Sequence, residues 1–172
     1  MIGGPGVWRR LSASSAVLLT CLSCSPNRDT EPEREALMQT SRAWARAAAS
    51  GDVERMVSFW ADDAIILPPD RPAVVGKDAI RDFVRRSFAL PHFSVTWEPE
   101  RARISAAGDI GYLVERNQFT FADSTGKMHT QFGKAVTVWR RDRTGPWVCI
   151  IDTWNASPSD RLLLDQGNPT SQ

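Results

Sequence analysis

Residues 50–83, SGDVERMVSFWADDAIILPPDRPAVVGKDAIRDF, contain the signals that decide the fold. Gly51 marks the end of one helix, and the apolar residues of 53–60 share one face of a second, short helix. A short apolar strand is expected at 64–67, and the prolines of 68–72 then require an irregular loop. The stretch therefore predicts two helices and a strand joined by tight connections.

The segments on either side complete the pattern. Upstream, apolar and small residues recur at three- and four-residue steps from Glu33, which predicts an amphipathic helix ending at Gly51. Downstream, the same spacing after Lys77 predicts a third helix that ends before Pro91. Beyond Pro91 the period changes to two, and strands are expected at 92–97, 101–105, 110–121, 129–140 and 147–154. Three helices followed by an antiparallel meander indicate an α+β fold.

The N-terminal residues predict export. An arginine pair at 9–10 precedes the uncharged run 11–23, which is shorter than the roughly 20 residues of a membrane-spanning helix. The run ends in LLTCLSC, 18–24, where a small residue before a cysteine resembles a bacterial lipobox. We expect Cys24 to carry the lipid, with Cys21 as the alternative acceptor. An ordinary cleaved secretory signal is the other alternative, and it would also export the protein, to the periplasm or the medium instead of a membrane of the cell envelope.

The whole chain divides into four parts. We place the lipoprotein-type signal at 1–24 and a polar, proline-broken tether at 25–32. A length of 172 residues suits one core, so a single globular domain is expected at 33–157. The polar end, 158–172, is expected to form a tail.

The composition argues against several classes of function. Lys and Arg total 21 and Asp and Glu total 20, and these charges alternate along the chain, so no nucleic-acid partner is expected. No metal-ligand spacing, phosphate-binding loop or serine-hydrolase elbow occurs, so neither a metal nor a cofactor is expected. Asp62 and Asp63 are interpreted as turn residues. If Cys24 is lipidated, Cys149 is the only thiol that remains in the mature protein, so a disulfide framework is excluded. Cys149 itself is expected to be a small core residue.

Several stretches resemble one family. They are MVSFWADDA at 56–64, VGKDAIRDF at 75–83, GKAVTVWRR at 133–141 and WVCIIDTWN at 147–155. Over about 33–157 the chain resembles the SnoaL-like, nuclear-transport-factor-2-like superfamily that includes ketosteroid isomerase, in its branch of unknown function. The resemblance implies a cone in which a strongly curved antiparallel sheet wraps around helices and leaves a pocket at the wide end. Because this fold hosts isomerases, dehydratases, cyclases and non-catalytic binders, its chemistry must come from the pocket.

The ketosteroid isomerase residues are not present. In the resemblance, the position of the oxyanion-hole tyrosine falls on Trp44, that of the catalytic carboxylate on Pro68, and that of the protonated carboxylate on Thr137. An indole is not a strongly acidic donor, and the proline side chain has no proton acceptor. Steroid isomerisation by that mechanism is therefore not expected.

Strand alternation indicates which side chains face the cavity, if Thr137 and Trp154 do. Asp152 shares their face, and Arg116 is predicted to face it from the neighbouring strand. We expect Asp152 to be the general base, because a carboxylate beside indoles in a partly dry pocket has a raised pKa. The alternative is a permanent structural pair between Asp152 and Arg116. The predicted ligand-binding set is Trp44, Trp60, Tyr112, Gln118, Thr137 and Trp154.

Two functions remain open from the sequence. Trp44 and Trp60 have the helical spacing of core residues, which favours packing over a ligand wall. The leading hypothesis is a cofactor-independent pocket for a small apolar or amphipathic molecule, with acid–base catalysis of the isomerase, dehydratase or cyclase type. The alternative is a non-catalytic interaction module whose interior is filled by its own aromatic residues. A homodimer is expected through the sheet face that would bear Phe119, Phe121 and Phe132.

Overall fold

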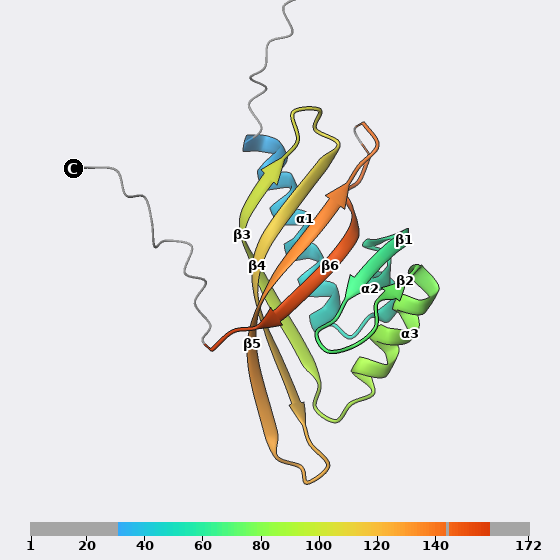
Figure 1. Ribbon diagram of the computed structural model, residues 1–172, viewed down its shortest axis with the longest axis vertical. Helices are drawn as coiled ribbons and strands as arrows, with labels where there is room; N and C mark the ends of the chain where they lie inside the picture. The colour runs from blue at the N-terminus through green and yellow to red at the C-terminus, as the bar shows by residue number, and fades with distance from the viewer. Residues whose placement is uncertain (1–30, 144, 159–172) are drawn as a thin grey trace, which may run out of the picture.

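The computed structural model describes residues 31–143 and 145–158 of the protein. Three helices and two short strands come first, and four longer strands follow (Figure 1). The elements are α1 (Glu31–Ala49), α2 (Val53–Val57), β1 (Trp60–Leu67), β2 (Val74–Val75), α3 (Lys77–Phe88), β3 (Ser94–Ile104), β4 (Ile110–Ala122), β5 (Met128–Arg140) and β6 (Val148–Ala156). The signal, Cys24 and the tail from 159 onward lie outside the described residues.

The connections between the helices follow the expected local chemistry. Gly51 takes a φ of 71°, a left-handed conformation that glycine adopts without steric cost, and it ends α1. Asp52 then caps α2, because its side chain accepts a hydrogen bond from the backbone N–H of Arg55 at 2.9 Å. α1 already begins at Glu31, so the last two residues assigned to the tether are helical.

A six-stranded curved sheet forms the other layer, in the order β2-β1-β6-β5-β4-β3. All neighbouring strands are antiparallel except β1 and β6, which are parallel. α1 runs along one face of the sheet and packs against β3, whereas α3 lies beside β1 and β2 (Figure 1). The predicted α+β fold with a strongly curved, mainly antiparallel sheet is confirmed.

The local predictions for residues 92–105 and for Asp62 and Asp63 are wrong. The strands expected at 92–97 and 101–105 are one strand, β3, whose register shifts between Pro99 and Arg101. A bulge allows a strand to contain a proline, whose backbone cannot donate to the sheet. Asp62 and Asp63 lie inside β1 instead of in a turn, and their exposed carboxylates form ion pairs with Lys77 at 2.9 Å and Arg140 at 2.7 Å.

The core is centred on four tryptophans. The Trp44 ring meets Trp60, Trp97 and Trp139 edge to face, with ring centroids 4.7, 4.9 and 5.4 Å away. These geometries are favourable for aromatic pairs. They join α1 to β1 near one edge of the sheet, to β5, and to β3 at the other edge. Trp44 is 3% exposed and Trp60 2% exposed, so both are core residues. The helical spacing of Trp60 with the apolar residues before it predicts that Trp60 lies on the second helix. This prediction is wrong, because Trp60 is the first residue of β1.

Candidate functional site

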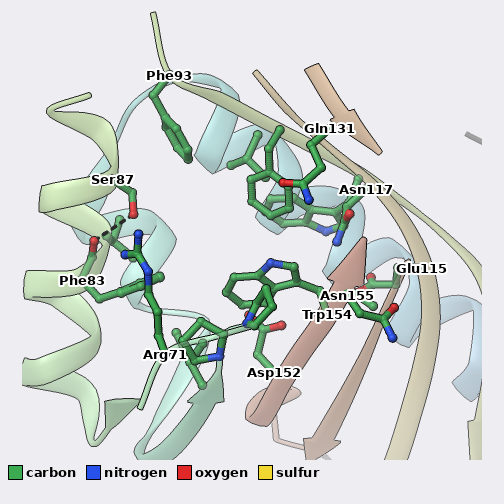
Figure 2. A pocket seen from close by; sticks show the side chains of 18 of the residues that line it. Arg71, Phe83, Ser87, Phe93, Glu115, Asn117, Gln131, Asp152, Trp154 and Asn155 are labelled. Carbon is green, nitrogen blue, oxygen red and sulfur yellow. Dashed lines mark hydrogen bonds between the residues drawn. The ribbon is translucent and has the colours of Figure 1, made fainter. Parts of the chain in front are cut away.

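A cavity of about 770 Å³ lies between the concave face of the sheet and α3 (Figure 2). Its volume falls within the range of small-molecule sites, which are mostly apolar with a few placed polar groups. Residues of α1, β1, the proline-rich loop after β1, α3 and the long strands contribute to it. The aromatic residues of its wall are Trp44, Trp60, Phe83, Phe88, Phe93, Trp97, Phe119, Phe121 and Trp154.

Part of the predicted site is in place. Thr137, Asp152 and Trp154 all line the cavity, as alternation on β5 and β6 predicts. Trp44 and Trp60 border it as well, so these two core residues also form its floor. The site is therefore built on the predicted strands β5 and β6.

The predicted facing of β4 is wrong by one residue. Thr137 is paired with Leu113, and side chains directly opposite each other on paired strands share a face. Tyr112, Arg116 and Gln118 consequently point to the outer face, where Tyr112 is 41% exposed. Arg116 and Gln118 border a shallow outer groove beside Phe132 instead of the cavity.

The geometry also removes the predicted pair between Asp152 and Arg116. Arg116 lies within 3.2 Å of Glu100 on the outer face, and its side chain is 49% exposed. Neither a catalytic pair nor a structural pair with Asp152 is possible across the sheet. Correcting the register brings Glu115, Asn117, Phe119 and Phe121 into the cavity wall.

Glu115 is the acidic residue that alternation in the wrong register missed. It is 2% exposed and lies on β4, between β5 and the edge strand β3. Ser41 Oγ donates to its Oε1 at 2.5 Å, and Thr137 Oγ1 donates to its Oε2 at 3.2 Å. Trp97 Nε1 donates to the Ser41 hydroxyl at 3.0 Å, and Trp139 Nε1 donates to the Thr137 hydroxyl at 2.8 Å. Two indoles thus support the two hydroxyls that hold one carboxyl group.

The donors in this network fix where the hydrogens lie. An indole N–H only donates, so the Ser41 and Thr137 hydroxyls must accept from it. Each hydroxyl has one hydrogen, which is then directed at Glu115. Both carboxyl oxygens therefore face donors, an arrangement that favours the ionised form of Glu115. A proton on Glu115 would have to point away from both hydroxyls.

Burial opposes this preference. Loss of water, with a smaller contribution from the charge of Glu98, raises the pKa of Glu115 to about 7, although the hydrogen bonds from Ser41 and Thr137 lower it. The group therefore exchanges its proton close to neutral pH.

Asp152 has a different environment. Its carboxyl group forms no hydrogen bond or ion pair with any residue in the described part of the chain, and its exposed fraction opens onto the cavity. Burial, together with a smaller contribution from the negative charge of Glu115, raises its pKa to about 8. Asp152 is paired in register with Thr137, the residue whose hydroxyl donates to Glu115, so the two acids lie on the strands on either side of β5. Figure 2 shows both acids on the sheet side of the cavity.

Asn117 adds a buried acceptor to the same wall. Its Oδ1 has no hydrogen-bond partner in the described residues, although Asn117 is almost fully buried. The opposite residue on β5 is Gly133, where an added Cβ would lie only 2.1 Å from that oxygen. Glycine at 133 therefore provides the space that the Asn117 side chain occupies.

Three other features of the described residues concern metal binding, membrane spanning and the thiol. Within 31–143 and 145–158 no three His, Cys, Asp or Glu side chains are grouped as metal ligands require, and no helix has the length and hydropathy to span a bilayer. Cys149 is buried, and burial raises the pKa of its thiol. The predicted role of Cys149 as a small core residue is confirmed.

The sequence profile of the SnoaL-like domain matches residues 37–150. The chain belongs to the SnoaL-like domain family. The match includes most of α1, the other two helices and the Glu115 network, it ends at residue 150 near the start of β6, before Asp152, and it confirms the family resemblance of the sequence motifs. No protein of curated function shows significant sequence similarity to this SnoaL-like domain.

Solved structures show the same fold. A ketosteroid isomerase-like protein from Erwinia carotovora atroseptica superposes with a TM-score of 0.66 at 21% identity, covering 74% of this chain and 99% of that one. A nuclear-transport-factor-2-like protein with a cystatin-like fold from Novosphingobium aromaticivorans gives 0.61 at 17% identity, covering 74% and 84%. A proposed dehydratase from Streptomyces avermitilis gives 0.59 at 17% identity, covering 74% and 98%. At these identities the likeness establishes the fold of the SnoaL-like domain and leaves its chemistry to the cavity.

Proposed function

We propose that this SnoaL-like domain binds a small apolar or amphipathic molecule in its cavity and exchanges protons with it through Asp152 and Glu115. One observation carries the proposal: two carboxyl groups with raised pKa share an aromatic cavity, and neither forms an ion pair within the described residues. Acid–base catalysis requires groups that change protonation near the working pH. The reaction class is cofactor-independent isomerisation, dehydration or ring closure.

The two acids suit different roles. Glu115 suits the base, because two hydroxyls hold it as an acceptor and each of its oxygens keeps a further lone pair. Asp152 suits the acid, because it lacks donors and burial favours its protonated form. This proposal reverses the general-base role that the sequence predicts for Asp152.

An isomerisation shows how the protons would balance. Glu115 takes a proton from a carbon of the ligand while Asp152 gives its proton to a ligand oxygen. Glu115 then returns the proton to a second carbon, and Asp152 recovers its own from the oxygen. Both acids end in their starting states, so no cofactor or external acid is consumed.

The names of two structural relatives support this class without assigning it. One relative is called ketosteroid isomerase-like and another is a proposed dehydratase, and both names denote proton-transfer chemistry. The cavity itself supports small-molecule binding over the alternative interaction module, because that module would have its interior filled by its own aromatic residues.

A screen followed by paired variants tests the proposal. We expect apolar and amphipathic compounds that bind the cavity to raise the melting temperature of the protein. For a compound that is turned over, Asp152→Asn and Glu115→Gln should each lower kcat about 100-fold or more, which is the contribution of one general acid or base. Arg116→Gln, on the outer face, is the control and should leave kcat unchanged. Full turnover by either acid variant, or the lack of any binding compound, would contradict the proposal.

Homodimerisation is a second part of the proposal, through a corrected surface. Phe119 and Phe121 line the cavity, so they cannot form the outer patch that the sequence predicts. The outer face instead exposes Tyr112 and Val136, each 41% exposed, near Phe132. A second copy covering this face would remove an apolar surface from water.

Export and lipid anchoring through Cys24 rest on the lipobox resemblance alone. In a bacterial host, the protein should incorporate labelled fatty acid and partition with membranes. Cys24→Ser should abolish both. Lipid uptake by Cys24→Ser would transfer the acceptor role to Cys21, and absence of label from the wild-type protein would leave an ordinary secretory signal.

A further inference from the structure

We propose that the ligand is an organic anion: an amphipathic acid whose apolar body lies on Trp154 and whose charged group is bound by Arg71 at the cavity mouth. This inference rests on the proposed function, since it names the class of molecule that the acid–base cavity accepts. It adds a binding residue, Arg71, that the sequence analysis did not single out.

Arg71 is the cation available to a ligand. Among the described residues that line the cavity, it is the one Lys or Arg side chain. It is exposed and has no hydrogen bond or ion pair within the described residues. Two arginines of the neighbouring helix α3 are already occupied, because Arg81 and Arg85 bind Glu54 at 3.0 and 2.8 Å. A guanidinium offers a planar fork of N–H donors that matches a carboxylate, sulfonate or phosphate.

The loop before β2 holds Arg71 at the mouth. Pro68 and Pro69 precede it and Pro72 follows it, and each proline fixes its own φ. Asp70, between them, has a φ of 56° that turns the chain. Asp70 also lines the cavity, but it forms no ion pair with Arg71. The prolines reduce the backbone entropy that Arg71 would lose on binding a ligand.

The charges inside the cavity place the anionic group of the ligand at the mouth. Glu115 and Asp152 lie on the sheet wall, and Arg71 lies across from Asp152 and Trp154, on the side toward α3 (Figure 2). An anion deep in the cavity would be repelled by ionised Glu115, whereas at Arg71 it would meet an opposite charge. The ligand's reacting part would then extend inward to the two acids.

The apolar body has a matching surface beside Arg71. Trp154 lies between two phenylalanine rings, with centroids 6.5 Å from Phe83 and 5.8 Å from Phe119. All three side chains are partly exposed and line the cavity, so their rings are open to a ligand. Flat apolar bodies stack favourably on such rings.

Two matched probes test the inference. 8-Anilinonaphthalene-1-sulfonate and N-phenyl-1-naphthylamine have the same rings and differ by one sulfonate group. We would titrate both into the full-length chain carrying Cys24→Ser, so that no acyl group competes, and follow probe fluorescence. Arg71→Gln should weaken the sulfonate probe about tenfold and leave the neutral probe within about twofold. Trp154→Ala should weaken both probes, which places them in the cavity.

Arg86→Gln is the control, because Arg86 is an exposed residue of α3 outside the cavity and the substitution removes the same charge. It should leave both probes unchanged. An equal loss of the sulfonate probe in Arg86→Gln and Arg71→Gln, or an equal loss of both probes in Arg71→Gln, would overturn the inference. Neutral-probe binding with no Arg71 dependence of the sulfonate probe would overturn it while leaving the proposed cavity intact. If neither probe binds, both proposals fail.

Discussion

The two faces of the sheet treat charge in opposite ways. On the outer face, Arg116 is exposed and lies beside the acidic Glu100. One residue earlier along the same strand, Glu115 is buried in the cavity wall and receives hydrogen bonds only from neutral hydroxyls. Charges that meet partners in water need no special environment, whereas a buried acid that forms no ion pair has its pKa raised. The comparison locates the candidate chemistry on the concave face.

The neighbouring residues Glu115 and Arg116 give the largest expected contrast. Glu115→Ala should lower the free energy of unfolding by about 3 kcal/mol, because it opens a void and leaves the Ser41 and Thr137 hydroxyls without an acceptor. Arg116→Ala should cost less than about 0.5 kcal/mol, as is usual for an exposed pair. Urea unfolding at neutral pH measures both values. Similar losses for the two variants would contradict the assigned faces.

The sequence predicts the fold well because its signals are local. Gly51, the proline-rich loop and the third helix each depend on neighbouring residues, and the structure places them as expected. The period of two beyond Pro91 predicts that the long strands exist, but it does not predict where their bulges lie. The misplacement of Trp60 shows the limit, since its helical spacing to the α2 residues continues by chance into β1.

The site is harder to predict because it depends on the register between strands. β4 has polar residues on both faces, with Glu115 and Asn117 on one and Arg116 and Gln118 on the other, so its amphipathic pattern does not choose a face. The hairpin turn contains the information that was missing. Pairing starts at Ala122 with Met128, and counting back from there sets Leu113 opposite Thr137. Arg71 lies in an irregular loop, where no periodicity in the sequence indicates which way its side chain points.

Asp152→Asn is expected to change the free energy of unfolding less than Glu115→Ala, and the size of its effect depends on pH. The exposed acid Asp63 provides the comparison. The pKa of Asp152 is raised to about 8 by burial, so the folded state binds more protons than the unfolded state between about pH 4 and pH 8. Its contribution to stability is present at low pH and is lost as the pH rises through that window. Asp152→Asn should therefore be near neutral in effect at about pH 4 and stabilising by about 2 kcal/mol at about pH 8. Thermal or urea unfolding across this range measures the change.

Asp63 is the matched control on an exposed part of β1. Its hydrogen bond to Arg140 lowers its pKa, so its contribution to stability is present at neutral pH and is lost as the pH falls through the lowered value. Asp63→Asn should thus destabilise at neutral pH, with a loss that shrinks toward acid pH. The same sign for Asp63→Asn and Asp152→Asn would show that Asp152 is a paired acid after all.

The outer face gives the smallest expected effect, on assembly. Val136→Asp places a charge in the exposed apolar patch and should weaken the proposed dimer at least tenfold, or about 1.4 kcal/mol. Sedimentation over a range of protein concentrations measures the dissociation constant. Lys134→Gln, which lowers the net charge by the same one unit at an exposed position on the same face two residues away, separates the loss of apolar contact from the change in charge. A wild-type protein that stays monomeric at tens of micromolar would contradict the dimer.

The most direct test of the account is a carbon-13 NMR titration of the side-chain carboxyl groups of aspartate and glutamate in the labelled protein. Two carboxyl groups should titrate as a coupled pair near pH 7 and pH 8. Glu115→Gln should remove one resonance and lower the pKa of Asp152, because the charge of Glu115 contributes to its shift, while Asp152→Asn should remove the other. If every aspartate and glutamate titrates below about pH 5, as solvated carboxyl groups do, the two acids are not shielded from water in the cavity wall and the proposed proton exchange has no basis.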